Sequence, residues 1–428
     1  MSHRLRVQLR GAVRAARLAI LAGLPVRPAD VPNPIDPVQI TAHTATSALG
    51  HGRAAHARAL RERRSGLRAN DFTREPLACA IGRVDGLEAQ PLPDGYERFE
   101  CRNNRLAWLG AQGDGFLDVA RAAVARHGAE RVALLLATST SSIGASEEAY
   151  ERLEDGRIPA DLRRPEVHTP HSLGLFLAAL TGARGPCLTT ATACSSSAKI
   201  FATAERLLRL GLVDAAILAG VDTLCGSVLY GFNSLELVSP EPCRPFDVAR
   251  RGISIGEAAG FALVERAADA LAPRLVGWGE SSDAHHMSTP HPEGLGARRA
   301  LDDALARAGL GAHEVDYINL HGTATPKNDE VEAAVVAAAF GARTRASSTK
   351  GWTGHTLGAA GILEVVISLL ALEHGFVPGT LNSTTLDPLC GPQVTLANED
   401  ADLRIALSNS FGFGGSNCTL AFARGDRA

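Results

Sequence analysis

Two pairs of segments along the chain repeat the same order of hydrophobic and polar positions. The first pair is residues 121–140 and 301–325, which aligns Val132 with Val315. Each segment is typical of a helix, a glycine-containing stop and a buried apolar strand, here predicted at Val315 to Leu320 in the second copy. The strand in each copy ends in small hydroxyl residues or histidine.

The second pair is residues 189–211 and 347–375, and it aligns Gly211 with Gly375. Each segment runs from a turn of small residues into an amphipathic helix that a glycine ends. The duplicated order predicts an α/β protein of two pseudo-repeated halves, each a mostly parallel sheet covered by helices, with a first strand from Val38 to Ala42. We expect the first half at residues 37–270 and the second at 271–428.

Composition narrows the class of protein. The 428 residues are 45% hydrophobic and 21% charged with a net charge of −3, which excludes a disordered chain and gives no electrostatic case for nucleic acid. No run approaches the roughly 20 apolar residues of a membrane span. The eight cysteines form no C-x-x-C pairs and have no histidine partners at zinc spacing, so we expect neither disulfides nor a bound metal. Without disulfides, we expect a cytoplasmic protein.

The N-terminal residues 1–36 form a basic extension and linker. Five arginines between residues 4 and 17 precede the short apolar run Leu18 to Val26, which resembles a signal peptide superficially. No small-residue cleavage site follows convincingly, so we favour a dispensable basic extension over an export signal.

Three strand-to-helix turns carry the candidate chemistry, because ligands of open α/β sheets bind beyond the carboxyl ends of the strands. Cys194 lies between a predicted strand, Cys187 to Ala193, and a predicted helix, Ser195 to Leu210. A helix start favours a thiolate, although a cysteine among alanines also fits simple core packing. His321 and His355 lie at similar glycine-flanked turns, and a Cys and two His at equivalent turns are hard to explain as packing.

Two charged residues fit a supporting role around these histidines. Lys350 precedes His355 by five positions and Glu332 follows His321 by eleven, so we expect a buried ion pair between Lys350 and Glu332 that orients the imidazoles. The lysine charge would also keep both histidines neutral. Asp329 and Glu330 are expected to be solvated.

Two glycine-rich segments are further candidates for a role in the chemistry. The loop from Asn409 to Asn417 has the sequence N-S-F-G-F-G-G-S-N, and the backbone N–H of Phe413 is a candidate oxyanion donor opposite Cys194. The segment Gly252 to Gly256 matches the G-x-S-x-G pattern of serine hydrolases but follows a polar stretch instead of a strand, so we do not expect a nucleophile there.

Four ordered motifs resemble one family. T-A-C-S-S-S, H-G-T-A-T-P-K-N-D, S-T-K-G-W-T-G-H-T-L-G-A-A-G and N-S-F-G-F-G-G-S-N, within roughly residues 37 to 424, are similar to those of β-ketoacyl-acyl-carrier-protein synthases of the thiolase superfamily. The resemblance implies a thiolase-like fold, a layered αβαβα sandwich. It also implies decarboxylative Claisen condensation of an acyl thioester with malonyl carrier protein.

The resemblance assigns roles residue by residue. Cys194 would accept the acyl group, the backbone N–H groups of Cys194 and Phe413 would form the oxyanion hole, and His321 and His355 would stabilise the malonyl enolate. Lys350 and Glu332 would support the two histidines. The substrate-binding residues would be Thr323, Thr325 and Phe411, and Phe413 would also act as a gate of the acyl pocket.

The resemblance also bears on partners and alternatives. Substrates would arrive on the phosphopantetheine of an acyl carrier protein with no other cofactor, and the enzyme would be a homodimer or the partner of a chain-length-factor-like subunit. Residues 224–239 look closer to ketosynthases of unsaturated-chain or aryl polyene pathways than to the commonest housekeeping elongation enzymes. The insertion in the first half offers a patch on which an acidic carrier protein could dock, made of four arginines: Arg152, Arg157, Arg163 and Arg164. A biosynthetic thiolase, with Cys418 as second cysteine, and a non-catalytic heterodimer subunit remain alternatives.

Overall fold

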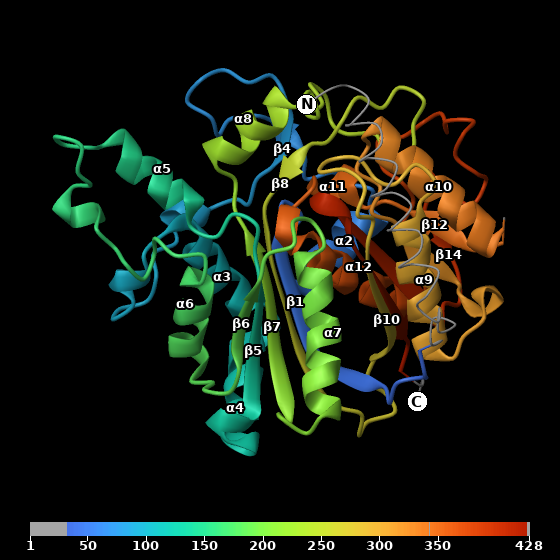
Figure 1. The fold of residues 1–428 in the computed structure, drawn as a ribbon, viewed down its shortest axis with the longest axis horizontal. Coiled ribbons are helices and arrows are strands. Elements are labelled where there is room, and N and C mark those ends of the chain that lie inside the picture. Colours follow the sequence, from blue (N-terminus) through green and yellow to red (C-terminus); the bar gives the residue numbers. More distant parts are fainter. Residues whose placement is uncertain (1–31, 342, 426–428) are drawn as a thin grey trace, which may run out of the picture. The chain divides into compact units, whose positions relative to one another are not determined.

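The structure is a computed structural model that describes residues 32–341 and 343–425, and the residues from Pro34 onward form one compact unit. The predictions for the basic run at residues 1–31 lie outside the described residues. The main sheet has the strand order β12-β11-β15-β16-β10-β1-β9-β7-β5-β6, with β2 (Gly50–His51) paired to β1 (Figure 1).

This sheet consists of two halves with the same internal arrangement. The first half contains β6 (Cys187–Thr190), β5 (Val132–Ala137), β7 (Ala215–Asp222), β9 (Ala258–Arg266) and β1 (Val38–Ser47). The second contains β12 (Arg345–Ser347), β11 (Tyr317–Asn319), β15 (Ile405–Gly412), β16 (Ser416–Ala423) and β10 (Arg274–Ser282). In both halves the first three strands run parallel and the next two pairings are antiparallel. The predicted duplication is therefore confirmed.

The two halves meet at only one end of their boundary strands. Between β1 and β10 the pairing is limited to Val38 with Leu275 and Gln39 with Arg274. Beyond these pairs the halves separate, and the helices α7 (Ser196–Arg209) and α12 (Ala360–His374) fill the space, each contacting strands of both halves. These are the two helices that the repeat predicted.

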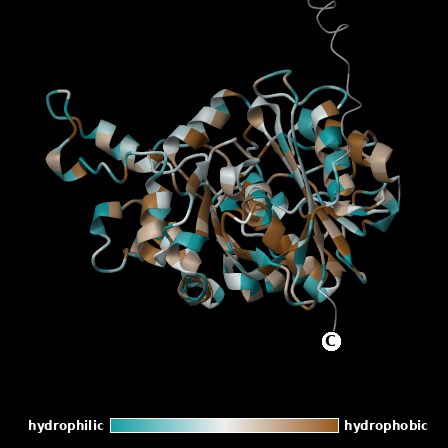
Figure 2. Ribbon diagram, turned by 60° about the horizontal axis from the view of Figure 1, so that its bottom comes forward, coloured by the Kyte–Doolittle hydropathy of each residue, from teal (hydrophilic) through white to brown (hydrophobic). Residues whose placement is uncertain are grey.

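Helices on the two outer faces complete five layers. On the first half these are α3 (Arg102–Gln112), α4 (Phe116–His127) and α6 (Ser172–Thr181), and on the second half α9 (Leu295–Ala308) and α10 (Pro326–Phe340). Hydrophobic residues concentrate on the strands and the central helices (Figure 2). The predicted αβαβα sandwich is thus confirmed.

The middle layer accounts for one long apolar helical stretch among the described residues. The helical stretch Leu357–His374 is long and apolar enough to cross a membrane, but 89% of it is buried inside the protein. A helix that is hydrophobic on all sides fits a position between two sheets.

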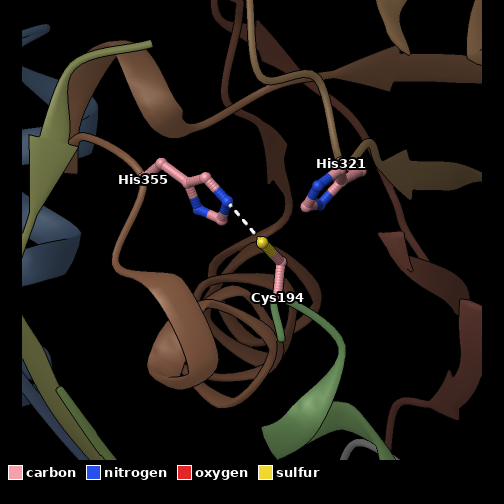
Figure 3. A group of neighbouring side chains, drawn as sticks. All are labelled: Cys194, His321 and His355. Atoms are coloured by element: carbon pink, nitrogen blue, oxygen red, sulfur yellow. Dashed lines mark hydrogen bonds between the residues drawn. The ribbon is translucent and has the colours of Figure 1, made fainter. Parts of the chain in front are cut away.

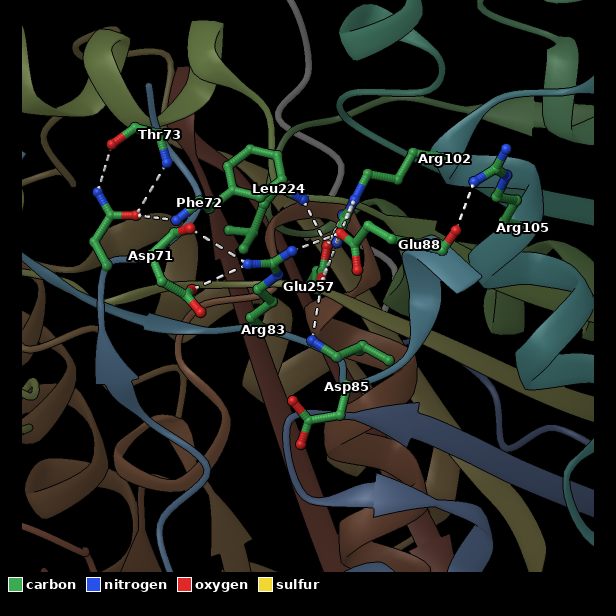
Figure 4. A network of polar contacts seen from close by, with 12 residues as sticks. Asp71, Phe72, Thr73, Arg83, Asp85, Glu88, Arg102, Arg105, Leu224 and Glu257 are labelled. Carbon is green, nitrogen blue, oxygen red and sulfur yellow. Dashed lines mark hydrogen bonds and ion pairs between the residues drawn. The ribbon is translucent and has the colours of Figure 1, made fainter. Parts of the chain in front are cut away.

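A network of charged side chains connects the ends of several strands near the cavity described below (Figure 4). The Glu257 carboxylate is fully buried, forms two hydrogen bonds with the Arg102 guanidinium, and accepts the backbone N–H of Val84 at 2.8 Å and of Leu224 at 2.9 Å. Leu224 leads into α8 (Gly226–Ser234), so this carboxylate fixes the start of a helix that lines the cavity described below.

We predict that Glu257→Ala lowers the free energy of unfolding by about 3–5 kcal/mol, because it leaves two buried backbone N–H groups without a partner and the Arg102 charge with only the half-exposed Glu88. Urea titration followed by circular dichroism measures the change. Glu88 pairs with the same Arg102 from a half-exposed position, so Glu88→Ala should cost only about 0–1 kcal/mol. Equal losses in the two variants would contradict the prediction.

Candidate active site

Cys194 lies in the short turn between β6 and α7 and is 5% exposed. The preceding residue, Ala193, has a positive φ of 52°, a strained conformation for a residue with a side chain. Ser139 Oγ donates to the Ala193 carbonyl at 3.2 Å, and Ser196 Oγ donates to the same oxygen at 2.5 Å. The strained turn is therefore held by hydrogen bonds from two elements.

His355 is fixed by its own backbone. Its N–H donates to Ser254 O at 2.7 Å and its carbonyl accepts the Gly256 N–H at 2.9 Å, next to the short strand β8 (Ile255–Gly256). Gly256 permits this approach, since a Cβ there would lie 2.2 Å from Thr353 O. Ser254 is fully buried and its Oγ accepts a backbone N–H from Cys243, so the G-x-S-x-G segment supports His355 and holds no exposed nucleophile.

His321 follows β11 and is held by Glu332 of α10. The two carboxylate oxygens accept the N–H groups of His321 and Gly322, each at 2.8 Å, and Asn409 Nδ2 donates to Oε1 at 3.2 Å. Glu332 thus acts on the backbone of the turn, and burial raises the pKa of its carboxyl to about 7.

The three predicted residues come together in one cluster (Figure 3). His355 Nε2 lies 3.0 Å from Cys194 Sγ, and the potential ligand atoms of Cys194, His321 and His355 all lie within 4.8 Å of one another. The two imidazole rings stand edge to face at 5.4 Å between centroids.

Lys350 supplies the charge next to this cluster, but its predicted ion pair with Glu332 is wrong. The Lys350 ammonium pairs with Glu364 of α12 and donates to the His321 carbonyl. Both charged side chains are almost completely buried. The sequence signal for Glu364 was present, since it is a lone acid within the apolar run of α12, a position where a charge needs a partner.

Burial and the Lys350 charge keep both histidines neutral, as expected. Burial lowers the pKa of His321 and of His355 well below the usual value, and Lys350 lowers both further. Neutral imidazoles can donate one hydrogen bond and accept another, which suits proton transfer and the stabilisation of an oxyanion.

The thiol behaves differently from the sequence expectation. Burial raises the pKa of Cys194 to about 11, while the Lys350 charge and the backbone N–H of Phe413 lower it. The predicted stabilisation of the thiolate by the helix start is outweighed by desolvation. The resting pair is therefore a neutral thiol beside a neutral imidazole, with His355 Nε2 placed to accept the thiol proton.

Two buried aspartates were not recognised as part of the site. Asp329 was expected to be solvated, but it is fully buried, accepts the N–H groups of Phe246 and Ala324, and has its pKa raised to about 6 by burial. Asp222 ends the apolar strand β7 and accepts bonds from Thr138 and from the Ala359 N–H, which connects the end of β5 to the turn after His355.

The cluster lies in a cavity of about 250 Å³. Its walls include the predicted substrate-binding residues Thr323, Thr325 and Phe411 and the predicted gate Phe413. The Thr323 and Thr325 hydroxyls lie 2.9 Å apart, and the half-exposed Phe413 ring packs on Phe232 of α8 at 5.6 Å between centroids.

A cysteine and two histidines at this spacing also match a metal-ligand set. Histidine ligands almost always donate their second ring N–H to a carboxylate or carbonyl. Here Nδ1 of His321 and of His355 is buried and has no hydrogen-bond partner among the described residues. The donor set fits an organic substrate better than zinc.

Comparison with known proteins gives consistent matches. Residues 36–270 match the family model "Beta-ketoacyl synthase, N-terminal domain", and residues 273–384 match the "Beta-ketoacyl synthase, C-terminal domain". The mitochondrial 3-oxoacyl-[acyl-carrier-protein] synthase of Arabidopsis thaliana is 36% identical over 56% of this chain and 57% of its own length, so the alignment spans a little over half of that relative. Nodulation protein E of Rhizobium meliloti is 35% identical over 65% of this chain and 72% of its own length.

A solved structure extends the similarity to almost the full chain. A chain of the complex of the ketosynthase ApeO with its chain length factor ApeC from Xenorhabdus doucetiae has a TM-score of 0.84 and 36% identity. The match covers 91% of this chain and 98% of that chain.

We predict that Lys350→Met slows alkylation of Cys194 by iodoacetamide at pH 8.5 by about tenfold, because loss of the nearby positive charge raises the thiol pKa by roughly one unit. In the wild type the rate should rise tenfold per pH unit between pH 7 and 9, as the thiol is still protonated there. Mass spectrometry of the Cys194 peptide measures the rate. Lys199→Arg, a charge-conserving change on α7 outside the cavity, should stay near the wild-type rate, whereas a wild-type rate already constant above pH 7 would refute the assignment.

Proposed function

The chain belongs to the β-ketoacyl synthase family, and from that premise we propose that it catalyses the decarboxylative Claisen condensation of an acyl thioester with malonyl-acyl carrier protein. The observation that carries the proposal is the contact of Cys194 Sγ with His355 Nε2 at 3.0 Å beside a second neutral histidine, His321.

In the first half-reaction the Cys194 sulfur attacks the acyl carbonyl of the carrier thioester. The thiol proton passes through His355 Nε2 to the departing carrier thiolate, so acyl-S-carrier and Cys194–SH become acyl-S-Cys194 and carrier–SH. The backbone N–H of Phe413, which already lowers the pKa of Cys194, is placed to stabilise the oxyanion of the tetrahedral intermediate.

In the second half-reaction the malonyl thioester loses carbon dioxide. The electron pair of the breaking bond forms an enolate, whose oxygen is stabilised by the N–H group of His321 and by that of His355, once the neutral His355 ring carries its proton on Nε2 instead of Nδ1. The enolate carbon then attacks the acyl carbonyl on Cys194 and gives the β-ketoacyl-S-carrier, and the released thiolate takes up one proton. Neutral histidines suit this step because an imidazolium would protonate the enolate carbon.

We propose that the carrier's phosphopantetheine arm enters along Thr323 and Thr325, whose hydroxyls line the cavity. The arginine patch is weak support for carrier docking, since Arg152 already pairs with Glu148 and Asp161. No cofactor beyond the arm is needed for either half-reaction.

The two alternative functions have less support. The thiolase reading needs a second reactive cysteine, but Cys418 is fully buried in the core between the sheets and does not line the cavity. A non-catalytic subunit would not need the complete Cys194, His321 and His355 set. A partner-dependent ketosynthase remains compatible, because ApeO is solved with a chain length factor.

We further propose a homodimer in the cytoplasm, in an aryl polyene or polyketide pathway. Strand β6 is an edge strand with Leu188 47% exposed, and such an edge is a template for pairing with a second copy. All eight cysteines lie in the described part of the chain and are free, which is typical of a reducing compartment.

The first prediction concerns the nucleophile. Incubation of the wild type with an acyl carrier protein should give an acyl adduct on the Cys194 peptide, and Cys194→Ala should give none. Intact-protein mass spectrometry detects the adduct. Cys101→Ala, at another buried cysteine outside the cavity, should acylate as the wild type does. A wild type that stays unmodified, or an adduct on Cys194→Ala, would overturn the proposal.

The second prediction separates the two half-reactions. His355→Ala should still form the acyl adduct at a reduced rate, but should release carbon dioxide from malonyl carrier protein about 10²–10³-fold more slowly, the effect of losing one oxyanion donor. Stopped assays of adduct and carbon dioxide on the same samples measure both. Normal decarboxylation by this variant would remove His355 from the second step.

A further inference from the structure

The segment from His321 to Lys327 runs along the wall of the active-site cavity and becomes steadily more exposed. His321 is 2% exposed and Thr323 7%, Thr325 is half-buried, and the Lys327 side chain is 69% exposed. These four residues all line the cavity that contains Cys194. Every second residue of the segment therefore marks a further step from the buried sulfur to the rim of the cavity.

Lys327 carries the only positive charge among the described residues that line this cavity. The other basic side chains of the lining, His321 and His355, are neutral because burial and Lys350 lower their pKa values. The one carboxylate of the lining, Asp283, is committed to the protein, since both of its oxygens accept protein N–H groups. An anionic group of a ligand in this cavity thus has one cationic partner, and that partner lies at the rim.

The Lys327 ammonium has room for a further acceptor. It donates to Glu330 Oε2 at 3.2 Å, in an exposed pair of a kind that contributes little to stability. An ammonium has three protons, and this bond uses one of them. Helix α10 begins at Pro326, so the N–H groups of Lys327 and Asn328 lie in its first turn, where the helix offers them no acceptor. An anion beside Lys327 would therefore meet a cation and nearby backbone donors.

The carrier arm has its chemical groups in the same order as this segment. Phosphopantetheine holds the acyl thioester at one end, two amides in the middle and a charged phosphate at the end attached to the carrier. When the thioester reaches Cys194, the hydrated phosphate is left at the rim. Lys327 follows His321 by six residues, at most about 20 Å of extended chain and less here because the chain turns into α10, a span that the roughly thirteen bonds of the arm can cover.

We propose that Lys327 binds the phosphate of the phosphopantetheine arm and so sets the depth to which the arm enters the cavity. The inference rests on the proposed condensing activity and deepens it, because it assigns the residue that recognises the far end of the arm. Lys327 acts in binding alone, since it touches none of the reacting atoms.

The test compares acylation of Cys194 by hexanoyl-4′-phosphopantetheine and by hexanoyl-pantetheine, which differ only in the phosphate. In the wild type, kcat/KM should be roughly three- to tenfold higher for the phosphorylated thioester, as expected for one charged contact at a partly exposed site. The difference should appear mainly in KM, because the phosphate is remote from the reacting carbonyl, and 0.5 M NaCl should reduce it. Equal kcat/KM values would overturn this inference alone. Failure of both thioesters and of the carrier-bound thioester would instead count against the condensing activity.

Two variants at neighbouring positions should change the preference in opposite directions. Lys327→Gln removes the cation from an exposed position and should bring the ratio of the two kcat/KM values close to one. Glu330→Gln removes the acid that competes for the ammonium and should raise the ratio above that of the wild type. Lys199→Gln, on α7 outside the cavity, should keep the wild-type ratio.

Three results would refute the assignment of Lys327. One is a Lys327→Gln enzyme with an unchanged ratio, and another is an equal loss for the two small thioesters, which would indicate a structural defect. The third is a loss confined to the carrier-bound thioester, which would show that Lys327 contacts an acidic side chain of the carrier instead of the phosphate.

Discussion

The buried Lys350 ammonium is the interaction on which the arrangement of the site depends. It joins α12 to the turn after β11, because the same Nζ contacts Glu364 and the His321 carbonyl. Its charge lowers the pKa of both histidines and of the Cys194 thiol. One cation therefore acts on the pKa of all three groups of the cluster, in addition to the larger effect of burial, while touching none of their side chains. A guanidinium would bring five N–H groups into a space with two acceptors, which explains a lysine at this position in a chain whose basic residues are nearly all arginine.

The duplicated sheet explains why these groups meet. Cys194 and His321 follow strands of different halves, and α12 carries Glu364 through the shared middle layer. Residues other than glycine with positive φ lie within three positions of Cys194, His321 and His355, at Ala193, Ala324 and Leu357. Such conformations cost roughly 1–3 kcal/mol each and persist only where the surrounding structure holds them. Asp222 and Glu332 supply that support by accepting backbone N–H groups in the turns.

Local patterns predicted the repeat, the α7 and α12 helices and the three reacting residues, because each depends on a strand, a turn and a helix that are contiguous in sequence. The errors concern long-range contacts. Sequence spacing paired Lys350 with Glu332, but spacing does not show which side chains point toward each other between layers. Asp329 looked solvated because its neighbours are polar, while its burial comes from the loop around Phe246. The thiol pKa was misjudged for the same reason, since desolvation is a property of the assembled site.

The run of hydroxyl residues after β5 supports the turn that holds Cys194. Ser139 donates to the carbonyl of Ala193, the residue of positive φ directly before Cys194. To hold that turn, and to bond Asp222, the hydroxyls must direct their protons into the protein. Asp222, which accepts from Thr138 and Thr140, also accepts the Ala359 N–H in the turn after His355. The end of β5 is therefore bonded to both turns whose side chains meet at 3.0 Å, that of Cys194 and that of His355.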